Sequence, residues 1–167
     1  MHRIAPMFTI VAVAALAGCD LPRDPDGTLK RVRGGTMRVG MVVDTPWVTD
    51  SGDGAGGIER TIVDDLSREL GAKVEWHRGS AEQLLDSLHE RELDLVIGGF
   101  TTQSPWKQQV ALTKAYYTDT LMLHGKRTEQ PHAVAVAPGE NAWQVAVERV
   151  LRGKRNEFPT LRRAAGR

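Results

Sequence analysis

Two side chains beyond an apolar run of the sequence could bind a cation. Asp44 and Trp47 follow residues 38–43, which have the pattern of a β-strand. A carboxylate attracts an ammonium group by charge, and the face of an indole ring adds a cation–π contact. A structural interpretation fits equally well: Asp44 would cap the loop and Trp47 would pack on the core. Both interpretations stay open at this point.

A second candidate site lies in the next polar segment, just before a short expected helix that begins with a Ser-Pro pair. Hydroxyl groups and backbone N–H groups at a helix start can hold an anion. A lysine follows in the expected helix and adds positive charge. The alternative is that the serine is a plain helix cap. The candidate binding residues of this segment are Phe100, Thr101, Thr102, Ser104 and Lys107.

Two tyrosines, Tyr116 and Tyr117, precede another apolar run. Tyr116 could line the same site, although tyrosines at the entry to a strand often pack at its edge. The histidines lack metal-ligand spacing and acidic or cysteine partners in the sequence, so we expect no metal site. Only His124 and His132 could face each other across a hairpin.

Three acidic residues of the first expected long helix, Glu59, Asp64 and Asp65, follow the spacing of a solvent-facing surface, so we interpret them as surface charge. The sequence contains no nucleophile elbow, phosphate-binding loop or zinc signature. We therefore expect a protein that binds a ligand, uses no cofactor and catalyses no reaction. The chain has 22 Lys+Arg against 21 Asp+Glu, which gives no basic patch for nucleic acid.

The elements that must position these residues alternate between short apolar runs and helical periodicities. This pattern predicts an α/β fold with a mainly parallel five-stranded sheet between two helical layers. The expected strands are residues 38–43, 73–77, 93–97, 120–124 and 133–137. The expected helices begin near Ile58, at Ser80 with a capping box to Gln83, at Ser104 and near Trp143.

The first nineteen residues indicate export. A short positive start, an apolar run over residues 7–17 and small residues lead into Cys19, the only cysteine. The run is too short for a membrane-spanning helix. We expect residues 1–18 to be a signal peptide, Cys19 to be lipidated, residues 19–36 to be a flexible tether, residues 37–153 to be one domain, and residues 154–167 to be a basic tail or frayed helix.

Residues 16–19, "LAGC", resemble the lipobox of bacterial lipoproteins. The segments "MRVGMVVDTPW", "GIERTIVDDLSRELG", "KVEW", "SAEQLLDSLHERELDLVIGG" and "FTTQSPWKQQVALTKAYYTD", in this order, resemble the first lobe of periplasmic solute-binding proteins of the polar amino-acid type, the receptors of ABC importers. Residues 132–152 resemble the stretch where that family returns to its first lobe. The resemblance implies a type II periplasmic-binding-protein lobe, with Asp44 and Trp47 matching positions that receive an ammonium-bearing ligand.

The sequence departs from the family at two places. The family inserts a second lobe between the strands that resemble residues 120–124 and 133–137, whereas here only residues 125–132 lie between them. We therefore expect the second lobe to be absent, and with it the closure around a solute. Members of the family use an arginine to bind the carboxylate of the ligand. The matching position of this sequence is Trp106, which makes an α-amino acid a less suitable ligand.

These observations lead to a functional prediction. We expect a lipid-anchored lobe on the periplasmic side of the cell membrane, at the inner membrane because Asp20 resembles the retention residue of many enteric lipoproteins. It would bind a small polar solute weakly, such as an amino acid or amine, or present it to an ABC transporter permease. The alternatives are an interaction module that docks on a transporter or sensor, and a degenerate receptor remnant.

Overall fold

The computed structural model describes residues 23–166, so the expected signal peptide and Cys19 lie outside the described residues. A five-stranded sheet forms the middle layer, in the order β4-β1-β5-β9-β6. Its strands are β1 (Thr36–Met41), β4 (Lys73–Arg78), β5 (Leu95–Ile97), β6 (Ala111–Leu112) and β9 (Ala135–Val136). Strands β4, β1 and β5 run parallel, while β9 is antiparallel to β5 and to β6. The α/β fold is confirmed, with a mixed sheet that has a parallel half.

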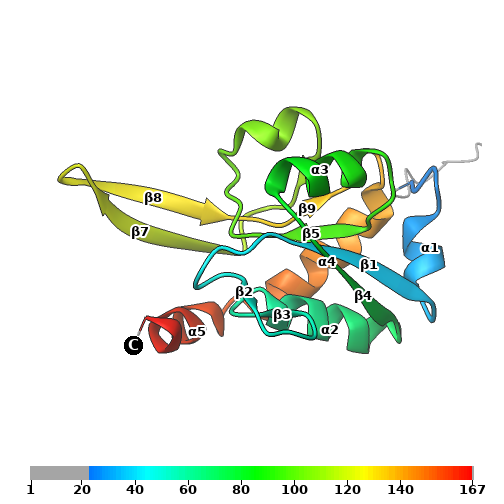
Figure 1. The fold of residues 1–167 in the computed structure, drawn as a ribbon, viewed down its shortest axis with the longest axis horizontal. Coiled ribbons are helices and arrows are strands. Elements are labelled where there is room, and N and C mark those ends of the chain that lie inside the picture. Colours follow the sequence, from blue (N-terminus) through cyan, green and yellow to red (C-terminus); the bar gives the residue numbers. More distant parts are fainter. Residues whose placement is uncertain (1–22, 167) are drawn as a thin grey trace, which may run out of the picture.

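Helices cover both faces of the sheet (Figure 1). They are α1 (Thr28–Val32), α2 (Arg60–Leu70), α3 (Ala81–His89), the 3₁₀ helix η1 (Pro105–Gln108), α4 (Asn141–Gly153) and α5 (Phe158–Ala165). Because side chains alternate along a strand, Leu95 and Ile97 belong to the core under α2 and α4. Val96 points the other way, into the core under α3. The lobe thus has three layers and two apolar cores.

The predicted helices match the structure closely where their apolar spacing is strong. The buried face of α2 consists of Ile62, Val63, Leu66 and Leu70, and Gly71 ends the helix in the left-handed conformation. Ser80 caps α3 with the expected capping box to Gln83. A small hairpin of β2 (Thr49–Asp50) and β3 (Ala55–Gly56) interrupts the loop after β1.

The strand expected at residues 120–124 is not part of the central sheet. It belongs to a separate hairpin of β7 (Tyr117–Leu123) and β8 (Lys126–His132), joined by a turn at His124 and Gly125. The hairpin projects from the lobe (Figure 1). Residues 125–132 are therefore mostly strand. The fifth strand of the sheet is β6, which the sequence did not predict.

The two ends of the described chain pack on the lobe, contrary to the expected tether and frayed tail. Val32 of α1 and Phe158 of α5 are both 0% exposed and belong to the larger core. From Arg23 onward the expected tether is thus part of the lobe. Leu29 of α1 and Leu161 of α5 pack partly against the same core. Each segment thus uses only two apolar side chains, three residues apart, which is too short a pattern to predict its packing from the sequence.

Candidate functional site

The carboxyl ends of the parallel strands β1 and β5 place the loops 42–57 and 98–104 side by side, where ligands of open α/β sheets bind. Asp44 is exposed, and its backbone pairs with Val48. Its carboxylate lies over Gly99: a Cβ atom there would be 2.2 Å from Asp44 Oδ2. Gly99 has φ 64°, so a glycine is required both for space and for conformation.

The Asp44 carboxylate has no cationic partner among residues 23–166. Partial burial raises its pKa, and no positive charge counteracts this effect. A carboxylate in this position is satisfied by water or by a cation from outside the lobe. Asp44 therefore remains a candidate for binding a cation.

Trp47, in contrast, is a core residue with 6% exposure. Its ring centroid lies 3.7 Å from that of His132 and 6.3 Å from that of Tyr116. The Arg162 guanidinium carbon of α5 lies 5.9 Å from the same ring. Groups of the lobe itself already surround the indole, so the structural interpretation of Trp47 fits the geometry better than that of a ligand wall.

Glu59 is the residue that sequence reasoning missed. It is 0% exposed, and its carboxylate accepts hydrogen bonds from Gly98 N (2.7 Å), Gly99 N (3.2 Å) and the Tyr116 hydroxyl (2.6 Å). Burial raises the pKa of Glu59 to about 7, against the opposing effect of these hydrogen bonds. Glu59 thus ties α2 to the loop that carries Gly99 beneath Asp44.

The interpretation of Glu59 as surface charge was therefore wrong. Glu59 precedes the first turn of α2 and lies four, seven and eleven residues before the buried Val63, Leu66 and Leu70. That spacing places it on the apolar face of the helix. The spacing was available in the sequence. The nearby Asp64 and Asp65 are half-buried and form ion pairs with Arg60 and Arg68.

The expected anion site at residues 100–104 is not formed as predicted. Thr102 N donates to Pro131 O (2.9 Å), and Ser104 N donates to Thr101 O (2.9 Å). Phe100 is buried, and its carbonyl accepts from Ala133 N. Contacts with the end of β8, with the residue that follows it and within the segment itself therefore occupy these backbone groups. The helix that follows is a four-residue 3₁₀ turn, and the Ser104 side chain makes no capping bond.

The cation expected beside this segment, Lys107, is exposed on η1, and Trp106 packs partly on the core under α3. The segment therefore offers hydroxyls of half-buried Thr101, Thr102 and Ser104 but no array of free amides. The segment therefore offers fewer hydrogen-bond donors to a ligand carboxylate than the sequence suggested.

Tyr116 and His132 contact the residues that carry the candidate site, Glu59 and Gly99. Tyr116 is buried, and burial, together with the charge of Glu59 and the hydrogen bond to it, raises the pKa of Tyr116 well above the usual value. His132 Nδ1 lies 3.1 Å from Gly99 O, and burial lowers its pKa, so the neutral ring donates through Nδ1. His132 pairs with Tyr117 and not with His124, which lies in the turn. Among residues 23–166, no three His, Cys, Asp or Glu side chains are grouped to hold a metal ion.

The sequence profile of the bacterial extracellular solute-binding proteins, family 3, matches residues 37–158. This chain belongs to that family. A search of curated protein sequences found no significant match.

Solved structures of similar fold share the lobe. The arginine-bound form of domain 1 from TmArgBP has a TM-score of 0.59 and 24% identity over 72% of this chain and 94% of that chain. A Salmonella typhimurium periplasmic binding protein with high arginine specificity has a TM-score of 0.65 and 13% identity, over 78% and 98% of the two chains. At these identities the likeness establishes the fold.

A third similar structure is an ancestral amino acid-binding protein, a precursor of cyclohexadienyl dehydratase, with a TM-score of 0.67 and 16% identity over 83% and 98% of the chains. The family 3 assignment and the match to an isolated first domain confirm the predicted single solute-binding lobe. The family assignment also supports an extracytoplasmic location.

Proposed function

We propose that this chain is a lipid-anchored, single-lobe receptor that binds a small amine-bearing cation weakly at Asp44 and presents it to a transporter in the inner membrane. The observation that carries the proposal is the exposed Asp44 carboxylate, which lies over Gly99 and has no cationic partner among the described residues. An ammonium or guanidinium group would supply that partner. One similar structure is described as arginine-bound and another as having high arginine specificity, which supports a cationic solute.

The proposed solute is an amine and need not be an α-amino acid. An amino acid also requires donors for its carboxylate, and the backbone N–H groups of Thr102 and Ser104 are already bonded within the lobe. Because a single lobe cannot close around its ligand, the interaction is open to solvent and weak. A membrane tether compensates through the high effective concentration of the lobe beside its partner.

The proposed anchor is a lipid on Cys19, after removal of residues 1–18. The sequence "LAGC" supports it, and Asp20 supports retention at the inner membrane. No helix within residues 23–166 has the length and apolarity needed to cross a bilayer.

The test measures thermal unfolding of the chain from residue 20 onward with lysine, arginine, putrescine and spermidine, and with N-acetylated putrescine as a weaker cation. Ligands that bind the native state raise the melting temperature. We expect a rise that Asp44→Asn abolishes and that Asp53→Asn, an exposed acid of the same loop, retains. A lack of response to all four amines, or an equal response in Asp44→Asn, contradicts the proposal.

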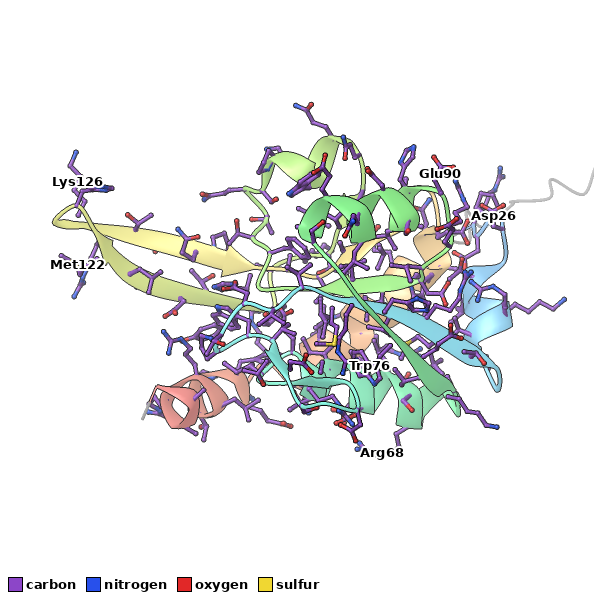
Figure 2. The ribbon with its side chains drawn as sticks, viewed as in Figure 1. Asp26, Arg68, Trp76, Glu90, Met122 and Lys126 are labelled. Carbon is purple, nitrogen blue, oxygen red and sulfur yellow. The ribbon has the colours of Figure 1, made fainter. Side chains whose placement is uncertain are left out.

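A second candidate is an interaction module. Val43 beside the site and Met122 near the hairpin tip are 58% and 66% exposed, which is unusual for large apolar side chains. Figure 2 shows Met122 at the far end of the hairpin. In this case no amine would bind, and charged substitutions at Val43 and Met122 would abolish co-purification of a membrane protein with the lipidated chain.

A further inference from the structure

The chain is fixed to the lobe only four residues after Cys19. Arg23 O accepts a hydrogen bond from Asn141 N (2.9 Å) at the start of α4. Asp24 then accepts from Trp143 N through Oδ1 and from Leu29 N through Oδ2, both at 2.9 Å. One carboxylate therefore caps the N-terminal ends of α4 and α1 together.

A buried carboxylate continues this attachment. Glu140, which is 1% exposed, accepts from Asp26 N and Thr28 N, each at 3.0 Å. Hydrogen bonds from these amides and the charge of Arg91 keep the pKa of Glu140 low in spite of burial. The path of the chain from Arg23 to α1 is thus determined by a set of hydrogen bonds between polar groups, several of them shielded from water.

The short distance along the chain limits how far the lobe can lie from a lipid on Cys19. Four residues span at most about 14 Å when fully extended. The expected tether of residues 19–36 would have allowed about four times that reach. If Cys19 carries the proposed lipid, the end of the lobe formed by α1 and the start of α4 must lie close to the bilayer surface.

The candidate site lies at the opposite end of the lobe. Helix α1 directly precedes the first residue of β1, Thr36, whereas Asp44 follows the last residue, Met41. A strand of six residues is about 17–20 Å long. Figure 1 shows α1 at one end of the lobe and the β7–β8 hairpin at the other, and Figure 2 shows Asp26 and Lys126 at these two ends.

The α1 end carries positive charge that is free to act outside the lobe. Two of its acids are paired: Arg31 and Arg38 bind Asp94, and Arg91 pairs with Asp26. Lys30 and Arg33 are exposed and form no ion pair within the described part of the chain. They border an open hollow of about 490 Å³ that half-buried Leu29 also lines.

We infer that Leu29, Lys30 and Arg33, here called the basal surface, lie on the anionic headgroups of the bilayer and hold the lobe with Asp44 about one strand length, roughly 17–20 Å, above them. This inference rests on the proposed lipid anchor. Basic side chains beside a membrane attachment point are attracted to anionic lipids, and their long stems contact the interface. The basal surface and the lipid together fix the orientation, which a flexible tether would leave free.

The orientation is tested with the lipidated chain in vesicles of phosphatidylglycerol and phosphatidylcholine that contain a headgroup-labelled quencher lipid. A fluorophore is attached at one cysteine, introduced as Thr36→Cys beside the basal surface or as Lys126→Cys near the hairpin tip. Both positions are exposed, and the thioether blocks Cys19. We expect several-fold stronger quenching at position 36 than at position 126, and a smaller difference at high salt.

The matched variants separate the basal surface from general charge effects. Lys30→Glu with Arg33→Glu should remove most of the difference in quenching, as should vesicles of phosphatidylcholine alone. Lys107→Glu with Arg127→Glu makes the same change of charge at exposed positions elsewhere and should leave it intact. Equal quenching at both positions, or a difference that survives Lys30→Glu with Arg33→Glu, overturns the inference.

Separate measurements distinguish failure of this inference from failure of the proposed function. Mass spectrometry of the membrane-extracted chain shows whether Cys19 is lipidated, and an unmodified cysteine overturns both the anchor and the orientation. A lipidated chain without a preferred orientation overturns only the basal surface. Amine binding at Asp44, measured by thermal unfolding, depends on neither result.

Discussion

Replacement of the buried Glu59 by glutamine should remove a strong pH dependence of stability. The pKa of Glu59 is raised from 4.5 to about 7 in the folded protein, chiefly by burial. At about 1.4 kcal/mol per pKa unit, ionisation of this carboxyl therefore costs the native state about 3 kcal/mol. The native state holds the proton more tightly than the unfolded chain, so this contribution to stability is greatest below about pH 4.5 and is lost as the pH rises through about 7.

Glutamine keeps the shape of the side chain and most of its contacts. Its carbonyl oxygen can accept from Gly98 N, and its amide can donate to the Tyr116 oxygen. It has no charge to lose or gain in this range. Glu59→Gln should therefore resemble the wild type near pH 4.5 and should be more stable by roughly 2–3 kcal/mol near pH 8.

Urea denaturation of both proteins between about pH 4.5 and 8.5 gives the free energy of unfolding at each pH. The difference between the two curves isolates Glu59, because the lowered pKa of His132 makes stability fall toward acid in both proteins. Asp64→Asn, a change of a half-exposed acid on α2, is the matched control and should follow the wild-type curve. The reasoning is refuted if Glu59→Gln shows the same loss between acid and alkaline pH as the wild type.

Three further substitutions test other contacts. Phe158→Ala should cost about 3–5 kcal/mol in urea denaturation, since the ring is fully buried; a cost below about 1 kcal/mol would mean that α5 is not part of the lobe. Gly99→Ala should destabilise by at least about 1–2 kcal/mol through its positive φ and should abolish amine binding by displacing Asp44; unchanged calorimetric binding would contradict the site. Asp24→Ala should cost about 1–3 kcal/mol and speed hydrogen exchange at the starts of α1 and α4; protection as in the wild type would argue against the shared cap.

Helices and the central strands could be predicted because their signals are local. The apolar spacing of α2, the capping box of Ser80 and the continuous apolar run of β5 are properties of neighbouring residues. Asp44 became a candidate because it follows a strand whose end is visible in the sequence. These features depend little on how the remainder of the chain folds.

The rest of the site depends on contacts between distant segments. The Thr102 amide donates to Pro131 of β8, a contact that the sequence does not show. The sequence left two interpretations of Trp47 open, and the His132 ring beside it supports packing on the core. The tether was overestimated because its attachment depends on a few hydrogen bonds. The Asp24 carboxylate accepts from Trp143 N of α4, and the Glu140 carboxylate accepts from Thr28 N of α1, so that segments more than a hundred residues apart in sequence are joined. Polar contacts of this range leave no periodic pattern.

The β7–β8 hairpin also affects how the lobe folds during synthesis. In two-lobe members of the family the first lobe is interrupted, so its last strand and helix are synthesised only after the whole second lobe. Here the turn at His124 and Gly125 joins the two parts directly. Only residues 98–134 separate β5 from its partner β9. The sheet can close during synthesis with less separation between its pairing segments, which favours faster folding. The same exposed turn is a natural place to insert a reporter domain without cutting through the core.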